Sequence, residues 1–260
     1  MGDFMGFVQV TYFGQTVWLP DDERYSWIRS MLARNRWERE TFATLSRFLD
    51  KETAYVDVGG WIGVLPFWAE RIAKRVITLE PDPYCNSTLS ELKMQNNSRV
   101  EIINAALSDK SSVCLNAMHD FGDSESTVLP LGNGAKVEVN SVKFDAVLAG
   151  IDEQKVFVKI DIEGYEYFIG EELKKLSDRK IVGVAFALHP DLFRRSIPSG
   201  SRLSRGYKVA AATWKLRHSI PGFRLSMTSY ERLKFFHFCF GKCLFKQDGL
   251  PGKDVLFVPE

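Results

Sequence analysis

Short apolar segments that fit β-strands alternate with segments of helical periodicity along most of this 260-residue chain. Strand-like runs lie at residues 55–58, 76–79, 100–104, 156–160 and 181–188. Helical patterns lie between several of them, at residues 67–73, 89–94 and 168–176. Parallel strands cannot be joined by a tight turn, so strands separated by helices pair in parallel through right-handed crossovers. The sequence therefore predicts an α/β protein with a doubly wound, mostly parallel sheet.

The first fifty residues do not follow this alternation. Residues 8–12 and 16–19 are rich in β-forming side chains and flank Phe13-Gly14-Gln15, which predicts a short hairpin. Apolar residues at helical spacing then predict two helices, which end near Leu49. We expect residues 1–50 to form a hairpin and helices packed on the core, and we expect no catalytic residue among them.

Residues 51–260 fit a single globular domain, because α/β chains of about 250 residues often form one unit. Within it, residues 108–136 are polar and carry no predicted element, and a strand-like run follows at 137–139. We expect an antiparallel edge near the C-terminus, formed by two of three strand candidates, at residues 207–211, 235–240 and 255–258.

The composition is that of an ordinary soluble protein, with 45% hydrophobic residues and a formal charge of +1. Four cysteines are too few and too scattered for a disulfide framework, and the N-terminus lacks the pattern of a secretion signal. The longest apolar run is far shorter than the roughly 18 residues that a membrane span needs. We therefore expect a cytoplasmic protein that does not cross a membrane.

Charge is unevenly distributed along the chain. Residues 191–260 contain 13 Lys and Arg against 5 Asp and Glu, whereas the rest of the chain is acidic. A basic C-terminal region could attract an anionic acceptor or associate with a membrane surface. The charges are spread over many residues, so they could equally be a solvated surface.

A glycine-rich loop follows the first strand of the alternating region, in Val56-Asp57-Val58-Gly59-Gly60-Trp61-Ile62-Gly63. Glycine permits unusual φ angles and a close approach of the backbone to a ligand, and a helix N-terminus offers unpaired N–H groups. Glu80 ends the next strand, 20 residues beyond Gly60, which is the spacing of a carboxylate that holds ribose hydroxyls. The pattern predicts a nucleoside cofactor, although such a loop alone also fits a tight turn.

Asp57 helps to decide which nucleoside cofactor binds. A dinucleotide would bring an anionic pyrophosphate to this loop, and a nearby carboxylate would repel it. S-adenosylmethionine instead carries an ammonium and a sulfonium. The spacing Gly-Gly-x-x-Gly also departs from the dinucleotide pattern Gly-x-Gly-x-x-Gly. The sequence therefore favours S-adenosylmethionine over NAD.

Four segments in this order resemble the FkbM family of class I methyltransferases. They are the glycine-rich loop, Thr78-Leu79-Glu80-Pro81-Asp82-Pro83, Asn104-Ala105-Ala106-Leu107-Ser108 and, most specifically, Val158-Lys159-Ile160-Asp161-Ile162-Glu163-Gly164-Tyr165-Glu166. A looser similarity lies in Asp254-Val255-Leu256-Phe257-Val258-Pro259. The resemblance implies a Rossmann-like fold and S-adenosylmethionine as cofactor.

The resemblance also implies roles for individual residues. Asp57, Gly59 and Gly63 would line the methionine end of the cofactor, Glu80 the ribose, and Asn104 and Ala105 the adenine. We place four further residues in the same cofactor site: Gly60, Trp61, Pro81 and Asp161. Two positions depart from the family, which usually has Ala where Gly60 stands and Glu where Ala187 stands. A role of that glutamate is therefore either dispensable or taken by another group.

In a doubly wound sheet, ligands bind beyond the carboxyl ends of the strands, and Asp57, Glu80, Asp161 and His189 fall at such ends. Methyl transfer to oxygen needs the acceptor, methyl and sulfur in line, and a group that takes the acceptor proton. We place Asp161, Glu163, His189 and Lys159 in the catalytic site. The first three are candidates for this base, because histidine titrates near neutrality and burial can raise the pKa of a carboxylate.

Plainer interpretations of these residues remain open. Lys159 lies in phase with Asp161, so the two could form a buried ion pair that only orders the strand end. His189, which precedes Pro190, could simply form a hydrogen bond to the loop. Glu163 could be stabilised by a helix dipole with no chemical role. A divalent cation held by Asp161, Glu163 and His189 is conceivable because oxygen ligands suit Mg²⁺, but we do not favour a metal.

The segment Gly122-Asp123-Ser124-Glu125-Ser126-Thr127 offers hydroxyl and carboxylate groups that suit hydrogen bonds to a polyol. We therefore propose Asp123, Ser124 and Ser126 as substrate-loop residues, against the alternative of a solvated, mobile loop. His237, Cys239 and Cys243 resemble part of a zinc site, but no second Cys/His pair accompanies them, so we expect packed hairpin residues.

These observations lead to one preferred function and two alternatives. The preferred function is S-adenosylmethionine-dependent O-methylation, with the sugar hydroxyl of a glycan or glycosylated metabolite as acceptor by family tendency alone. Methylation of nucleic acid is the first alternative, although no Asp/Asn-Pro-Pro-Tyr segment and no Pro-Cys nucleophile is found. The second is a binding module that keeps the cofactor fold without catalysis, consistent with Ala187. The oligomeric state does not follow from the sequence.

Overall fold

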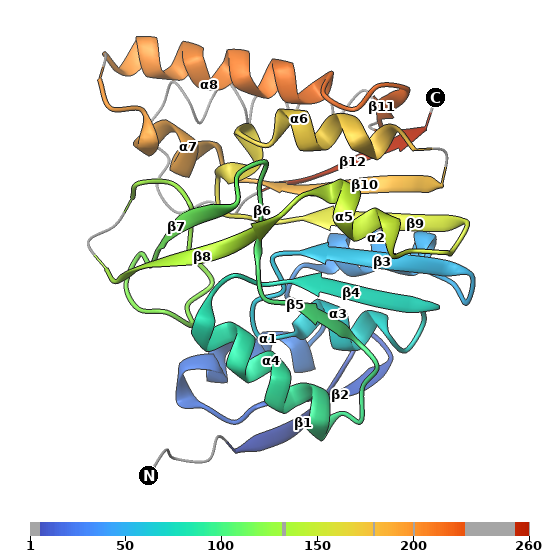
Figure 1. Cartoon of the computed structure of the whole chain (residues 1–260). Helices are drawn as coiled ribbons and strands as arrows, with labels where there is room; N and C mark the ends of the chain where they lie inside the picture. The colour runs from blue at the N-terminus through green and yellow to red at the C-terminus, as the bar shows by residue number, and fades with distance from the viewer. Residues whose placement is uncertain (1–5, 132–133, 179, 200, 227–252, 260) are drawn as a thin grey trace.

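The computed structural model describes residues 6–131, 134–178, 180–199, 201–226 and 253–259. Its central feature is a seven-stranded sheet flanked by helices (Figure 1). The strand order is β11-β12-β10-β9-β3-β4-β5. The strands are β3 (Thr53–Val58), β4 (Arg75–Leu79), β5 (Glu101–Ile103), β9 (Lys155–Ile160), β10 (Ile181–Leu188), β11 (Phe223–Leu225) and β12 (Lys253–Pro259).

Five neighbouring strands, from β10 to β5, pair in parallel, and β12 is antiparallel to both of its neighbours. The predicted doubly wound α/β fold with an antiparallel C-terminal edge is therefore confirmed. The register between β3 and β9 pairs Asp57 with Lys159. The acidic end of the first parallel strand thus lies beside the lysine of the most specific sequence segment.

Both faces of the sheet are covered, which explains the nearly continuous apolar sequence of its strands. In β3, Ala54, Val56 and Val58 belong to one buried hydrophobic cluster and Tyr55 to the other, as the two-residue period of a strand requires. One cluster includes residues of α5 (Phe144–Ala149), α6 (Gly170–Leu173) and α8 (Arg202–Arg217). The other includes residues of α1 (Ser26–Ala33), α2 (Arg39–Phe48), α3 (Val64–Ala69) and α4 (Pro83–Gln95).

The N-terminal residues form the expected hairpin, β1 (Phe7–Tyr12) with β2 (Gln15–Pro20), followed by a 3₁₀ turn (Glu23–Tyr25), α1 and α2. The hairpin lies beside α3 and α4 (Figure 1). Tyr12 is buried, and its hydroxyl donates to the carbonyl of Val64 at 2.8 Å. The N-terminal residues therefore share a hydrophobic cluster with the sheet.

The polar region after β5 differs from the expectation. It contains β6 (Ala106–Leu107), β7 (Ser112–Asn116) and β8 (Lys136–Val142), which form a separate three-stranded sheet of order β6-β8-β7. The strand at 137–139 exists but does not join the central sheet. The sequence does not predict β7 because only two of its five residues, Val113 and Leu115, are apolar and buried.

Two further expectations are wrong. Residues 207–211 are not a strand but part of α8, where Ser201 caps the helix by accepting from the N–H of Ser204. The predicted helix at 168–176 is broken into α6 between the 3₁₀ turns Tyr165–Tyr167 and Lys174–Ser177.

The helix expected at 67–73 begins earlier, as α3. The strand at 255–258 is confirmed as part of β12, and residues 235–240, with His237, Cys239 and Cys243, lie outside the described residues.

One more helix, α7 (Pro190–Ser196), follows β10 directly, and His189 is its N-cap residue. No helix in the described part of the chain is long and apolar enough to cross a membrane.

Candidate active site

The loop after β3 turns sharply because its glycines adopt conformations that other residues rarely reach. Gly59 has a φ of +96°, and a Cβ there would lie 1.9 Å from the carbonyl oxygen of Asp161. The N–H groups of Gly59 and Gly60 both donate to the carbonyl of Leu79, at 2.9 and 3.1 Å. Gly63 has a φ of +81° and is the N-cap of α3. The loop is therefore held against the ends of β4 and β9.

Asp57 is fully buried at the end of β3. Its Oδ1 accepts a hydrogen bond of 2.7 Å from the hydroxyl of Tyr55, and Thr78 Oγ1 lies 3.5 Å from Oδ2. Burial raises the pKa of Asp57 to about 6, although Lys159 and these hydrogen bonds lower it. A cation placed beside this carboxylate would favour its ionised form.

Backbone N–H groups of two loops hold the carboxylate of Glu80 in place. Its Oε2 accepts from the N–H of Trp61 and its Oε1 from the N–H of Asp82, each at 2.7 Å. Burial raises its pKa to about 8, against the opposing effect of these two hydrogen bonds. Each carboxylate oxygen can accept two hydrogen bonds, so capacity remains for ligand hydroxyls.

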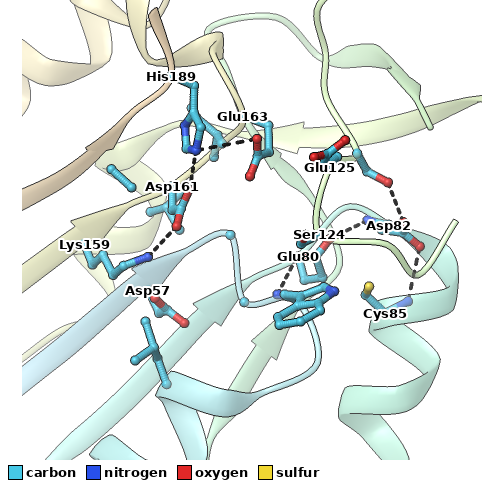
Figure 2. Close-up of a pocket in the computed structure, with 18 of the residues that line it drawn as sticks. Asp57, Glu80, Asp82, Cys85, Ser124, Glu125, Lys159, Asp161, Glu163 and His189 are labelled. Carbon is cyan, nitrogen blue, oxygen red and sulfur yellow. Dashed lines mark hydrogen bonds and ion pairs between the residues drawn. The ribbon is translucent and has the colours of Figure 1, made fainter. Parts of the chain in front are cut away.

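A cavity of about 880 Å³ opens beyond the carboxyl ends of the parallel strands. Asp57 and Glu80 line it together with Asp161, Glu163 and His189 (Figure 2). The four strand-end side chains that the sequence singled out therefore do face one common hollow. The other expected site residues that line it are Gly59, Gly60, Trp61, Pro81, Ala105, Lys159, Asp123, Ser124 and Ser126.

Two expected cofactor residues do not line the cavity. Asn104 is exposed, while its neighbour Ala105 is part of the wall. Gly63 lies behind the glycine-rich loop, where a Cβ would meet the ring of Phe67 at 2.4 Å. Gly63 thus shapes the loop from the protein side.

Lys159 and Asp161 form the ion pair that the sequence left open, with Nζ 2.8 Å from Oδ2. Burial alone would raise the pKa of Asp161, but Lys159 and His189 together hold it below its ordinary value. The other oxygen, Oδ1, is buried and has no hydrogen-bond partner among the described residues. Asp161 is therefore an ionised carboxylate with one oxygen available to a ligand.

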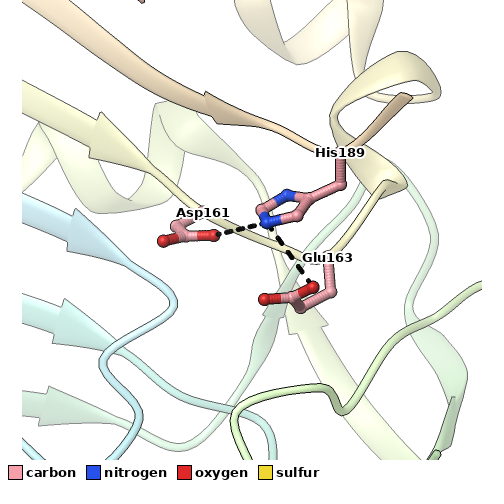
Figure 3. A group of neighbouring side chains, drawn as sticks. All are labelled: Asp161, Glu163 and His189. Atoms are coloured by element: carbon pink, nitrogen blue, oxygen red, sulfur yellow. Dashed lines mark ion pairs between the residues drawn. The ribbon is translucent and has the colours of Figure 1, made fainter. Parts of the chain in front are cut away.

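His189 lies among three carboxylates (Figure 3). Its Nε2 is 3.8 Å from Asp161 Oδ1 and 3.6 Å from Glu163 Oε2, and its Nδ1 is 3.3 Å from Glu166 Oε1. Burial alone would lower the pKa of His189, but these carboxylates outweigh it and hold that pKa well above its ordinary value. Burial raises the pKa of Glu163. His189 and Glu163 therefore keep their protons at a pH at which the same side chains would lose them in water.

The segment 122–127 is tied to both sides of the cavity. Asp82 caps α4 through Oδ1, and its Oδ2 accepts from the N–H of Gly122 at 2.9 Å and the hydroxyl of Ser126 at 2.7 Å. The hydroxyl of Thr127 donates to the carbonyl of Glu163 at 2.7 Å. The segment is thus anchored rather than a freely solvated loop. Ser126 uses its hydroxyl proton in this anchor.

Several wall residues were not expected from the sequence. Trp27, Met31 and residues 36–41, which include Arg36 and Glu38, contribute to the cavity wall. The first fifty residues, in which the sequence predicts no catalytic residue, therefore contribute to the wall of the cavity. No sequence motif marks them, because they reach the cavity only through the packing of α1 and α2 on α3 and the sheet.

The match to known families agrees with this geometry. The family model of the methyltransferase FkbM domain matches residues 57–186, which is half of the chain. The chain belongs to the FkbM methyltransferase family. No curated protein matches it.

Solved structures give weaker similarities to this FkbM methyltransferase. A Streptococcus mutans protein described as a methyltransferase, in complex with SAH, has a TM-score of 0.49 and 12% identity over 85% of this chain and 97% of that one. An rRNA methylase from Streptococcus thermophilus has a TM-score of 0.44 and 11% identity over 85% and 94% of the two chains.

The FkbM chain keeps its two departures from the family pattern within the site. A Cβ on Gly60 would lie 2.2 Å from Thr78 Oγ1, so the space for an alanine methyl is already filled. Ala187 lines the cavity near the end of β10, two residues before His189, and offers no polar side-chain group there. Asp161, Glu163 and His189 are titratable side chains that line the same cavity.

Proposed function

We propose that this methyltransferase uses S-adenosylmethionine to methylate a hydroxyl group, and that the acceptor is a sugar of a glycan or glycosylated metabolite. The observation that carries the proposal is the shared cavity, which Asp57 and Glu80 line together with Asp161, Glu163 and His189. Its volume of about 880 Å³ lies within the range of roughly 300–1,000 Å³ for small-molecule sites.

The charge of the wall supports a cationic methyl donor. Ten of the lining residues are Asp or Glu and three are Lys or Arg, so acids remain in excess although burial raises the pKa of Glu80 and of Glu163 to about 8. Asp57 would face the sulfonium and ammonium groups, which stabilise its ionised form, whereas the pyrophosphate of NAD would be repelled. Glu80 would accept from the ribose hydroxyls, and Ala105 would lie against the adenine.

The reaction needs little covalent help from the protein, because the sulfonium already activates the methyl group. The acceptor oxygen must lie in line with methyl and sulfur, and its proton must leave as the new C–O bond forms. The proposed place for this oxygen is beside Asp161, Glu163 and His189, which together would hold it and receive the proton.

The same charge distribution favours a neutral polyol over nucleic acid. A phosphate backbone would have to approach a wall with more than three acids for each base, and phosphate contacts supply most of the affinity in nucleic-acid binding. Asp123 and Ser124, on the anchored segment, are suited to bind sugar hydroxyls. A gel-shift titration would test the alternative, with salt-dependent binding of RNA or DNA as the contrary result.

Calorimetry with S-adenosylmethionine and with NAD tests the cofactor, and binding of NAD alone would contradict it. Formation of S-adenosylhomocysteine on a panel of glycans tests the acceptor. Asp161→Asn distinguishes an enzyme from a non-catalytic binding module. If the wild type turns over and this substitution abolishes turnover, the site is catalytic and the binding module is excluded. Thermal unfolding of Asp161→Asn shows whether the variant is folded, since Asp161 is itself among the residues expected in the cofactor site.

A further inference from the structure

Three side chains at the end of the cavity could hold a metal ion. Asp161 and Glu163 follow β9 and His189 follows β10, and one ligand atom from each lies within 4.8 Å of the other two. Their donor atoms point toward a common space (Figure 3). An imidazole nitrogen with two carboxylate oxygens is a donor set for a divalent cation of intermediate softness, such as Mn²⁺.

The distances suit a bridging ion better than direct contact. His189 Nε2 is 3.6 Å from Glu163 Oε2 and 3.8 Å from Asp161 Oδ1, beyond the range of a good hydrogen bond. Two donor atoms that bind one ion at about 2.1 Å each can lie up to about 4.2 Å apart. An ion can therefore bind both pairs after small side-chain movements.

The second oxygen of Asp161 and the second nitrogen of His189 already have partners. Lys159 binds Asp161 Oδ2, which leaves Oδ1, a buried atom without a hydrogen-bond partner among the described residues. Glu166 faces His189 Nδ1 and is itself fully buried. Ligating histidines usually donate their other N–H to a carboxylate in this way, which directs the remaining nitrogen to the metal.

The sequence alone does not favour a metal here, but the arrangement of the three side chains does. We propose that Asp161, Glu163 and His189 bind one divalent cation, and that this cation holds the acceptor hydroxyl. The second part rests on the proposed function. Three protein ligands leave coordination positions open, and an oxygen bound to a cation loses its proton more readily. With the cation bound, Asp161, Glu163 and His189 are its ligands, so the acceptor proton passes to water instead of to these side chains. The oxygen forms its bond to the methyl carbon, and the carbon–sulfur bond breaks with the electron pair left on sulfur.

Mn²⁺ binding to the whole 260-residue chain tests the site directly. The protein is first freed of metal with a chelator, and binding of added Mn²⁺ is then measured by electron paramagnetic resonance. We expect one Mn²⁺ per chain. His189→Ala and Glu163→Gln should weaken binding at least 100-fold. Glu166→Gln removes no ligand and should weaken it about 10- to 100-fold. The matched controls are His218→Ala and Glu171→Gln, both at exposed positions outside the cavity wall, and they should bind like the wild type.

Thermal unfolding of each variant shows whether it is folded, so that loss of binding can be assigned to the site. Wild-type protein that binds no Mn²⁺, or His189→Ala that binds it unchanged, would overturn the cation site. Full methyl transfer to a glycan in excess chelator would overturn the cation's role and leave the proposed function intact. Mn²⁺ binding without transfer to any acceptor would support the site and contradict the proposed function.

Discussion

Glu166 lies behind His189 as seen from the cavity, with Oε1 3.3 Å from Nδ1, while Nε2 faces Asp161 and Glu163. The same oxygen accepts from the N–H of Ile162 at 3.0 Å, so the carboxylate is fixed from two directions. Glu166 is not among the residues that line the cavity. We infer that Glu166 positions His189 and selects Nε2 as the imidazole nitrogen that faces the cavity.

Glu166→Gln should therefore lower the rate of methyl transfer without weakening cofactor binding. Glutamine keeps an oxygen for Ile162 but cannot orient the imidazole as a carboxylate does, so we expect kcat to fall about 10- to 100-fold. The KM for S-adenosylmethionine should not change. A rise in that KM with unchanged kcat would contradict this role, and Glu171→Gln, at an exposed position of α6, is the control.

Much of this site was predictable, and the reason is geometric. Asp57 and Glu80 end parallel strands, and the carboxyl ends of such strands share one edge, so their meeting at one cavity follows from the strand pattern. The anchoring role of Asp82 was not predictable in this way. Its contacts to Gly122 and Ser126 join segments about forty residues apart, and local sequence carries no signal for such contacts.

The errors have a similar origin. Residues 207–211 contain Tyr207 and Val209, which favour strands, but the capped sixteen-residue segment around them forms a helix instead. Glu38 reaches the cavity from the N-cap position of α2, where its φ is +39°. Neither outcome follows from local propensity, because each depends on what the segment packs against.

Glu80 should couple cofactor binding to proton release. Its pKa is about 8 without cofactor, so at pH 7 it is mostly protonated. Ribose hydroxyls and a cationic donor favour the ionised form, which lowers this pKa and releases up to about one proton at pH 7. Affinity for S-adenosylmethionine should therefore rise with pH below about 8.

Calorimetry of S-adenosylmethionine binding in buffers of different ionisation enthalpy measures this release. Glu80→Gln should release clearly fewer protons and bind more weakly, whereas Glu171→Gln should behave like the wild type. Equal proton release by the wild type and Glu80→Gln would show that another group titrates.

Gly59→Ala should be much more costly than a glycine substitution of similar backbone conformation elsewhere. Gly14 has a φ of +79° with no atom within 4 Å of the place where a Cβ would lie, so Gly14→Ala adds mainly backbone strain of about 1–2 kcal/mol. At Gly59 the methyl also meets the carbonyl oxygen of Asp161, and we expect at least twice that loss. Denaturant unfolding measures both, and equal losses would mean that the loop can move away from β9.

Ser126→Ala should loosen the segment 122–127 without unfolding the protein. It removes the 2.7 Å hydrogen bond to Asp82, while the N–H of Gly122 keeps its own. We expect faster hydrogen exchange in this segment and a several-fold higher KM for the acceptor, because fewer conformations present Asp123 and Ser124 to it. The control is Ser90→Ala, whose hydroxyl donates to Asn86 within α4. Unchanged exchange would mean that the remaining contacts suffice.

The pairing of Gly60 with Thr78 makes a final prediction about a position where the family usually has alanine. Gly60→Ala would place a methyl 2.2 Å from Thr78 Oγ1, which must move, and should destabilise the protein. Thr78→Ala removes that oxygen together with only a long 3.5 Å contact to Asp57. In the double variant the methyl fits, so we expect a favourable coupling of about 1 kcal/mol in a double-mutant cycle of unfolding free energies. Additive losses would mean that the threonine rotates away freely and that Gly60 is kept for another reason, such as the approach of the cofactor.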